Sequence, residues 1–123
     1  MSLSPRDMDF AESKNGAARD VALAFGVPPM LLGIPGDNTY ASFREANLAF
    51  WRQTILPLAA RFAGAFGNWL GPAWSDGLRL SYDSDQVEAL SLEREALWRR
   101  VNRADFLTPD EKRQAVGYGA AST

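Results

Sequence analysis

Apolar residues in the first part of the chain recur every three or four positions, the spacing of an amphipathic helix. Ser4, Pro5 and Asp7 form a helix-start signal, because serine can cap, proline suits the first helical position and an acid can complete a capping box. Gly26 suits the end of this helix. The weaker apolar series in between comprises Ala11, Ala18, Val21, Ala22 and Phe25. The pattern therefore predicts a first helix over residues 4–26.

A far more apolar pattern occupies residues 40–70 and predicts one long helix, which Gly71-Pro72 should end. Pro57 lies inside it and predicts a kink, because proline removes a backbone hydrogen bond and clashes with the carbonyl four residues earlier. A helix that is apolar on more than one side needs cover on more than one side. We expect neighbouring subunits to supply that cover. The candidates for intersubunit or core packing are Phe43, Phe50, Trp51, Ile55, Leu58, Phe62, Phe66 and Trp69.

Between these two helices, residues 28–39 are rich in residues that interrupt regular structure. The helix-breaking and kink positions of the chain are Gly26, Pro28, Pro29, Gly33 and Pro57. One helical turn is expected over residues 28–32, followed by a loop over 33–38. Asn38 or Thr39 should cap the long helix, and Ser42 with Glu45 offers a second capping box.

The last third of the chain predicts one short strand and two shorter helices. Residues 78–83 alternate with period two, which predicts a strand that buries Leu78, Leu80 and Tyr82. Its partner is expected in another chain or in sequence beyond this one. Residues 90–117 should form the C-terminal helices, the second started by a capping box of Thr108 with Glu111 and stopped by Gly117. The inward face of the first should comprise Leu90, Leu97, Val101 and Ala104.

Charged residues on that first C-terminal helix favour a solvated face over a DNA-binding patch, because acids and bases are interleaved. They are Glu93, Arg94, Glu95, Arg99, Arg100 and Arg103. The whole chain has a net charge of -2, which argues against a freestanding nucleic-acid binder.

Composition excludes most chemistry before any motif is considered. The 123 residues contain neither cysteine nor histidine, the residues that most often act as nucleophile, proton shuttle or metal ligand. Asp83 and Asp85 resemble the start of a calcium loop, but the sixth and twelfth positions hold Glu88 and Arg94 instead of glycine and glutamate. The loop over 33–39 lacks the lysine of a phosphate-binding loop. We expect no cofactor, no metal, no membrane segment and no enzymatic activity.

The order of these features resembles the C-terminal part of the HK97-type portal proteins of tailed phages, prophages and gene transfer agents. The resemblance rests on the Gly-Pro-rich stretch over residues 25–40, Phe50-Trp51 with Leu56-Pro57-Leu58, the acids Asp83 and Asp85, and the closing run over residues 106–113. It implies a mainly α fold, with a long proline-kinked helix, shorter helices and one short strand or hairpin. The chain, residues 1–123, would be a single portal fragment.

The resemblance also implies a role for each segment. Residues 4–26 would be a stem-like helix, 28–39 the approach to a tunnel loop, 40–70 the long kinked wing helix, 78–83 a wing-like strand and 90–117 the crown-side helices. The channel-lining candidates are Ile34, Pro35, Gly36, Asp37, Asn38 and Thr39.

Portal proteins of this type form a ring, usually of twelve subunits, at one capsid vertex. The resemblance therefore implies self-association and contacts with terminase, capsid and head–tail adaptor proteins. It implies non-specific passage of double-stranded DNA, assembly in the bacterial cytoplasm and a place in a virion or phage-like particle. The alternative interpretation is a small helical adaptor that binds a partner helix through an apolar groove.

Overall fold

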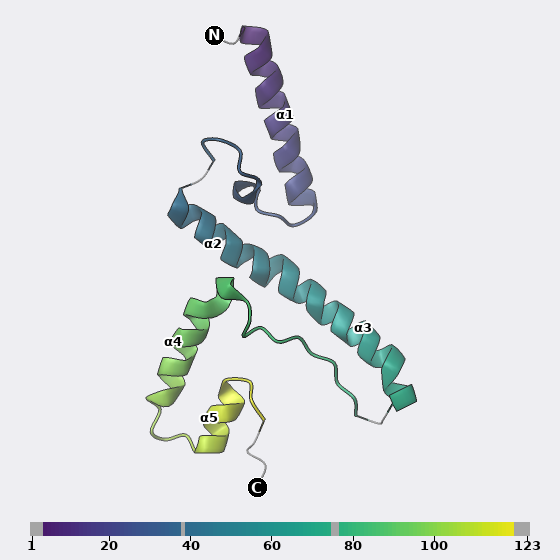
Figure 1. Ribbon diagram of the computed structural model, residues 1–123, viewed down its shortest axis with the longest axis vertical. Helices are drawn as coiled ribbons and strands as arrows, with labels where there is room; N and C mark the ends of the chain where they lie inside the picture. Colours follow the sequence, from purple (N-terminus) through teal and green to yellow (C-terminus); the bar gives the residue numbers. More distant parts are fainter. Residues whose placement is uncertain (1–3, 38, 75–76, 120–123) are drawn as a thin grey trace. The chain divides into compact units, whose positions relative to one another are not determined.

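The computed structural model describes residues 4–37, 39–74 and 77–119, and the chain divides into two compact units, Met1–Tyr82 and Asp83–Thr123. The described residues are mainly α-helical, as the sequence predicts (Figure 1).

Helix α1 spans Pro5–Ala24, and hydrogen bonds expected from its sequence define both of its ends. The Ser4 hydroxyl accepts from the Asp7 N–H at 3.2 Å and donates to the Asp7 carboxylate at 2.6 Å. At the other end Gly26 adopts the left-handed conformation, with φ of 70°. The Gly26 N–H then bonds to the Leu23 carbonyl at 3.0 Å and the Val27 N–H to the Ala22 carbonyl at 2.8 Å, the paired bonds of a Schellman motif.

A single 3₁₀ turn, η1, follows at Pro29–Leu32 and stops at Gly33, which is again left-handed. Helix α2 spans Tyr40–Phe50 and has Thr39 as its N-cap. Thr39 and Ser42 form the capping box, since the Thr39 hydroxyl accepts from the Ser42 N–H at 3.3 Å and Ser42 Oγ accepts from the Thr39 N–H at 2.8 Å. The expected second box of Ser42 with Glu45 was wrong, because Ser42 is already the third residue of the helix. Asn38 lies outside the described residues.

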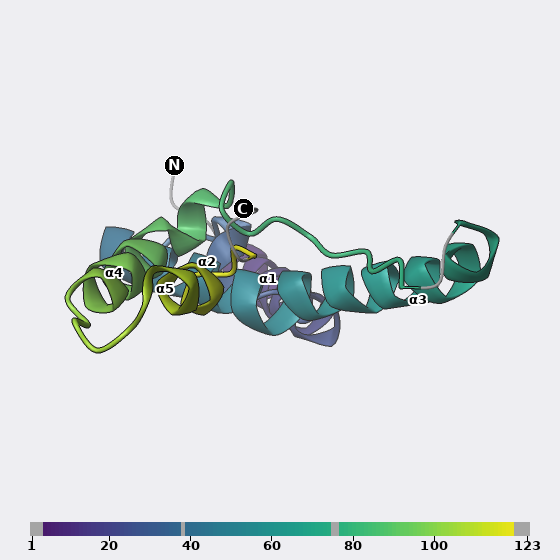
Figure 2. The ribbon, with the colours of Figure 1, turned by 90° about the horizontal axis from the view of Figure 1, so that it is seen from below.

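Helix α2 continues through a π-helical turn, η2 (Trp51–Ile55), into α3 (Leu56–Trp74), so that the three form one continuous rod (Figures 1 and 2). In the π turn the Leu56 N–H reaches five residues back to the Trp51 carbonyl. Pro57 follows directly, where the chain cannot donate the usual bond four residues back. The irregularity expected at this proline therefore takes the form of a wider helical turn just before it.

The long helix was expected to end at Gly71-Pro72. It continues instead to Trp74, with Pro72 inside its last turn. A proline withdraws only its own N–H, so a helix loses one bond there and can close a final turn beyond it. The predicted end of the helix at residue 70 was therefore wrong by four residues.

One hydrogen bond joins the π turn to the end of α1. The Thr54 hydroxyl donates to the Gly26 carbonyl at 2.5 Å. A Cβ atom at Gly26 would lie 2.8 Å from the Thr54 Oγ1 atom, closer than real Cβ contacts allow. Gly26 therefore has two reasons to be glycine: its positive φ and the close approach of Thr54.

The strand expected over 78–83 was wrong: within the described ranges these residues are extended but belong to no sheet. They run back along α3 in both views (Figures 1 and 2), over a hollow lined by Ala60, Ala63, Gly64 and Gly67. Leu80 and Tyr82 stay 43% and 44% exposed. Period-two alternation reports that alternate side chains face a surface. Here that surface is the small-residue side of a helix, and no described strand is available for pairing.

The C-terminal unit contains a 3₁₀ turn, η3 (Glu88–Leu90), and two helices, α4 (Ser91–Asn102) and α5 (Pro109–Ala115). Its buried side chains are Leu90, Val101 and Val116, the first two on the predicted inward face. The predicted capping box is present, because the Thr108 hydroxyl accepts from the Glu111 N–H at 3.3 Å and the Glu111 carboxylate accepts from the Thr108 N–H at 2.8 Å. Gly117, with φ of 91°, ends α5 as expected.

We predict that Gly26→Ala destabilises the chain more than Gly33→Ala does. Both positions have φ near 70°, but an added Cβ meets Thr54 only at Gly26 and meets nothing within 4 Å at Gly33. The shared cost of a left-handed alanine is about 1 kcal/mol, and the Thr54 clash with its broken hydrogen bond should add about 1–3 kcal/mol at Gly26. Urea unfolding of both variants measures the difference. Equal destabilisation would contradict the role given to Thr54.

Candidate functional site

Helix α3 presents a row of large apolar side chains that the other described residues leave about half exposed or more. Leu58 is 46% exposed, Phe62 57%, Phe66 47% and Trp69 72%. These four residues, called the aromatic face below, are spaced by three or four positions and so lie on one side of the helix. Phe62 and Phe66 stack with ring centroids 6.5 Å apart, and Phe66 lies 6.2 Å from Trp69. The aromatic face is an ordered apolar surface.

The other predicted packing residues differ in how much of each side chain is exposed to solvent. Phe50, Trp51 and Ile55 are half-buried, whereas Phe43 is 42% exposed. The buried side chain on α2 is that of the small Ala46. The interior of this unit is therefore made by small residues, and the large ones stay near the surface.

Contiguous exposed apolar side chains such as those of the aromatic face mark interaction surfaces. Cover of the long helix by a neighbouring subunit stays a prediction.

The loop that follows η1 is tied to α1 by a two-point ion pair. The Arg19 guanidinium donates to the two carboxylate oxygens of Asp37 at 2.9 Å and 2.7 Å. The hydrogen bonds from Arg19 hold the pKa of Asp37 below its usual value, and those to Asp37 raise the pKa of Arg19. Of the predicted channel-lining residues, Pro35, Gly36 and Thr39 are exposed and Ile34 and Asp37 half-buried, while Asn38 lies outside the described ranges. Arg19 was not predicted, because it lies 18 residues from Asp37 and forms no local motif with it.

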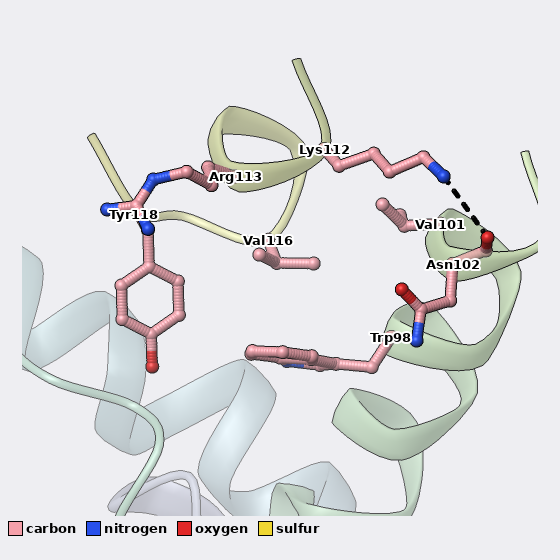
Figure 3. A pocket seen from close by; sticks show the side chains of 7 residues that line it. All are labelled: Trp98, Val101, Asn102, Lys112, Arg113, Val116 and Tyr118. Atoms are coloured by element: carbon pink, nitrogen blue, oxygen red, sulfur yellow. Dashed lines mark hydrogen bonds between the residues drawn. The ribbon is translucent and has the colours of Figure 1, made fainter. Parts of the chain in front are cut away.

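In the C-terminal unit, α4 and α5 enclose an apolar hollow of about 280 Å³ (Figure 3). Trp98 and Val101 line it from α4, and Val116 and Tyr118 from the end of α5. The cations at its rim have partners, since Lys112 Nζ donates to the Asn102 carbonyl at 3.2 Å and Arg113 Nε to the Gly119 carbonyl at 2.9 Å. A lining of this kind suits apolar packing rather than acid–base chemistry.

A polar cluster beside this hollow joins the two ends of the C-terminal unit. Asp85 pairs with Arg94 and accepts from the Tyr118 hydroxyl at 3.0 Å, and that hydrogen bond raises the pKa of Tyr118. The Tyr118 ring meets Trp98 edge to face at 5.9 Å. Arg94 was expected to be solvated, but it is half-buried in this cluster. No sequence signal links Asp85 with Tyr118, which lie 33 positions apart.

In residues 4–37, 39–74 and 77–119 the acidic side chains form no group of three that could hold a metal ion. No helix in the same ranges is long and apolar enough to cross a membrane.

Comparison with known proteins identifies relatives along almost the whole chain. It is 50% identical over 117 residues to an uncharacterised protein of Rickettsia felis, covering 95% of this chain and 30% of the relative. It is 26% identical over 116 residues to the portal protein of Enterobacteria phage HK97, covering 91% of this chain and 27% of that protein. The chain thus spans about a third of the length of its relatives.

Comparison with solved structures also finds similar chains over almost the whole length of this one. A chain from the neck of a native GTA particle, computed with C12 symmetry, matches with a TM-score of 0.74 and 51% identity over 98% of this chain and 34% of that one. A chain from the neck of an empty GTA particle, computed with C6 symmetry, matches with a TM-score of 0.75, 51% identity and coverage of 98% and 33%. The family model described as "Phage portal protein" matches residues 1–117. The chain therefore belongs to the phage portal protein family.

Proposed function

We propose that the full-length protein is the portal subunit of a phage-like particle. Its copies form a ring at one capsid vertex, through which DNA is packaged and ejected, and the ring joins the head to the tail. The observation that carries the proposal is the 51% identity to a chain from the neck of a GTA particle, over 98% of this chain. The role is structural rather than enzymatic.

The aromatic face supplies a physical reason for assembly. Burying a Phe, Leu or Trp side chain that is about half exposed gains on the order of 1–2 kcal/mol. Four such residues on one helix form a surface that a neighbouring subunit would cover. When one surface of a subunit packs on a different surface of the next, the contacts close into a ring if the rotation divides a full turn. The C12 and C6 symmetries of the matching necks support a ring of twelve.

Within such a subunit we assign the segments by their place in the chain. Helix α1 is the stem-like helix, the loop after η1 approaches the tunnel, and the α2–α3 rod is the long helix of the wing. The C-terminal unit is the crown-side part. Terminase, capsid proteins and head–tail adaptors are the partners of the assembled ring, which forms in the bacterial cytoplasm.

The loop that includes Pro35 and Gly36 suits a surface along which DNA passes without being held. Its acid, Asp37, is neutralised by Arg19, so the loop presents neither a strong attraction nor a strong repulsion to phosphate. The ion pair also fixes the loop against α1 at two points. A fixed, charge-balanced loop can line a channel without gripping what moves through it.

Native mass measurement of the full-length protein tests the ring. We predict that Phe62→Glu with Phe66→Glu weakens subunit association by at least about 100-fold, because two half-exposed rings lose their burial and gain buried charges. Phe106→Glu is the control: it makes one such substitution at a side chain that is 86% exposed and lies outside α3. Both variants should keep wild-type helicity by circular dichroism. A wild-type protein that remains strictly monomeric would overturn the proposal.

The Arg19 guanidinium should control the pKa of the Asp37 carboxyl. Arg19→Gln should raise the pKa of Asp37 toward the ordinary value of about 3.9, since the guanidinium hydrogen bonds that lower it are removed. In the wild type the pair stabilises the fold above that ordinary value, and its contribution disappears as the pH falls through the lowered pKa. An NMR pH titration of the Asp37 carboxyl measures the shift. Arg6→Gln, which removes an exposed arginine of the same helix, should leave Asp37 unchanged.

A further inference from the structure

Three arginines at the C-terminal end of α4, two in its last turn and one at its C-cap, line one shallow hollow of the C-terminal unit. Arg99, Arg100 and Arg103 surround the small side chain of Ala96, and the hollow measures about 340 Å³. At 3.6 residues per turn the three arginines fall within an arc of roughly 100°. The buried Val101 lies on another side of the helix, so this arginine face is turned away from the interior of its own unit.

These three arginines form no ion pair within the described residues, in contrast to Arg19, which pairs with Asp37, and Arg94, which pairs with Asp85. The one bond made by their guanidinium groups is a long one, 3.4 Å, from Arg99 to the Glu95 carbonyl. Glu95 lies one helical turn before Arg99. Three exposed guanidinium groups around one hollow concentrate positive charge at one place.

We propose that the arginine face binds the phosphate backbone of double-stranded DNA. Guanidinium groups bind phosphate oxygens by charge-assisted, two-point hydrogen bonds, and contacts of this kind carry no base preference. The sequence alone favoured a solvated face because Glu93 and Glu95 are interleaved with the arginines. The structure adds that the three arginines line one hollow and that Arg94 is engaged with Asp85, while Glu95 lines a neighbouring hollow beside Arg99. The inference rests on the proposed function, which brings DNA to the ring.

A simpler explanation is that basic residues near the C-terminus of a helix interact favourably with its dipole. That explanation accounts for the stability of α4 but predicts no effect on DNA binding. The two explanations therefore differ in a measurable property.

The test uses the full-length protein and a short blunt-ended duplex, with affinity measured by fluorescence anisotropy over a range of salt concentrations. Arg99→Gln with Arg100→Gln and Arg103→Gln should lower the affinity about tenfold or more at moderate salt. The slope of log affinity against log salt should become shallower by about 0.9 for each phosphate group that the variant no longer binds. The corresponding triple lysine variant should recover only part of the binding, because lysine keeps the positive charge but cannot make the two-point hydrogen bonds of a guanidinium group.

The matched control removes three other exposed arginines, Arg6, Arg44 and Arg79, which lie in the N-terminal unit and share no hollow. This control has the same net charge as the Arg99, Arg100 and Arg103 glutamine variant. It should bind the DNA duplex with nearly the affinity of the wild type. An equal decrease in the control would show a general effect of charge and overturn the inference. Unchanged binding in the Arg99, Arg100 and Arg103 glutamine variant would overturn it too, as would equally tight binding of poly-glutamate.

Native mass measurement on the same samples separates this inference from the proposed function. A ring that forms normally but shows no dependence on the arginine face refutes the DNA site alone. Loss of the ring in the glutamine variant would place the arginines in a subunit interface and also refute the site. A wild-type protein that forms no ring refutes the proposed function itself.

Discussion

Helix α3 carries its large side chains on one side and its small ones on another, and the N-terminal unit depends on that division. Ala60, Ala63, Gly64 and Gly67 let the extended segment 78–82 lie directly along the helix. At Gly67 an added Cβ would be 3.9 Å from the backbone nitrogen of Leu80. The chain thus covers the flat side of α3 with its own extended segment, and nothing described remains to cover Phe62, Phe66 and Trp69 on the other side.

Turns and caps could be predicted from sequence because their causes are local. Ser4 and Thr108 cap helices through bonds that span three residues, and Gly26 and Gly117 end helices because only glycine enters the left-handed region without strain. The apolar excess of the long helix could also be predicted, since periodicity reports which positions share a face. These features needed no knowledge of the rest of the fold.

The features that could not be predicted have causes that are not local. Alternation over 78–83 shows that alternate residues face a surface, but it cannot show whether that surface is a sheet or a helix. The partners of Asp37 and Asp85 lie 18 and 33 positions away, in Arg19 and Tyr118, and follow from how the chain folds back. The arginine face likewise becomes distinct only once Arg94 is seen to be engaged with Asp85. For the candidate site, the sequence could therefore predict individual residues but not which of them contact one another.

The π turn before Pro57 has a consequence for how insertions and deletions act on this rod. A wider turn holds an extra residue, so it absorbs that residue without changing the side of the rod on which later residues lie. Loss of one residue from Trp51–Ile55 would restore ordinary winding and leave later side chains near their present direction, whereas loss of one residue from the regular turns between the π turn and Phe62 would rotate every later side chain of α3 by roughly 100° about the axis. Each residue would keep its identity and its helical state, yet Phe62 and Phe66 would point toward a different neighbour. The direction in which this helix presents its rings is thus encoded by a count of residues as well as by their kind.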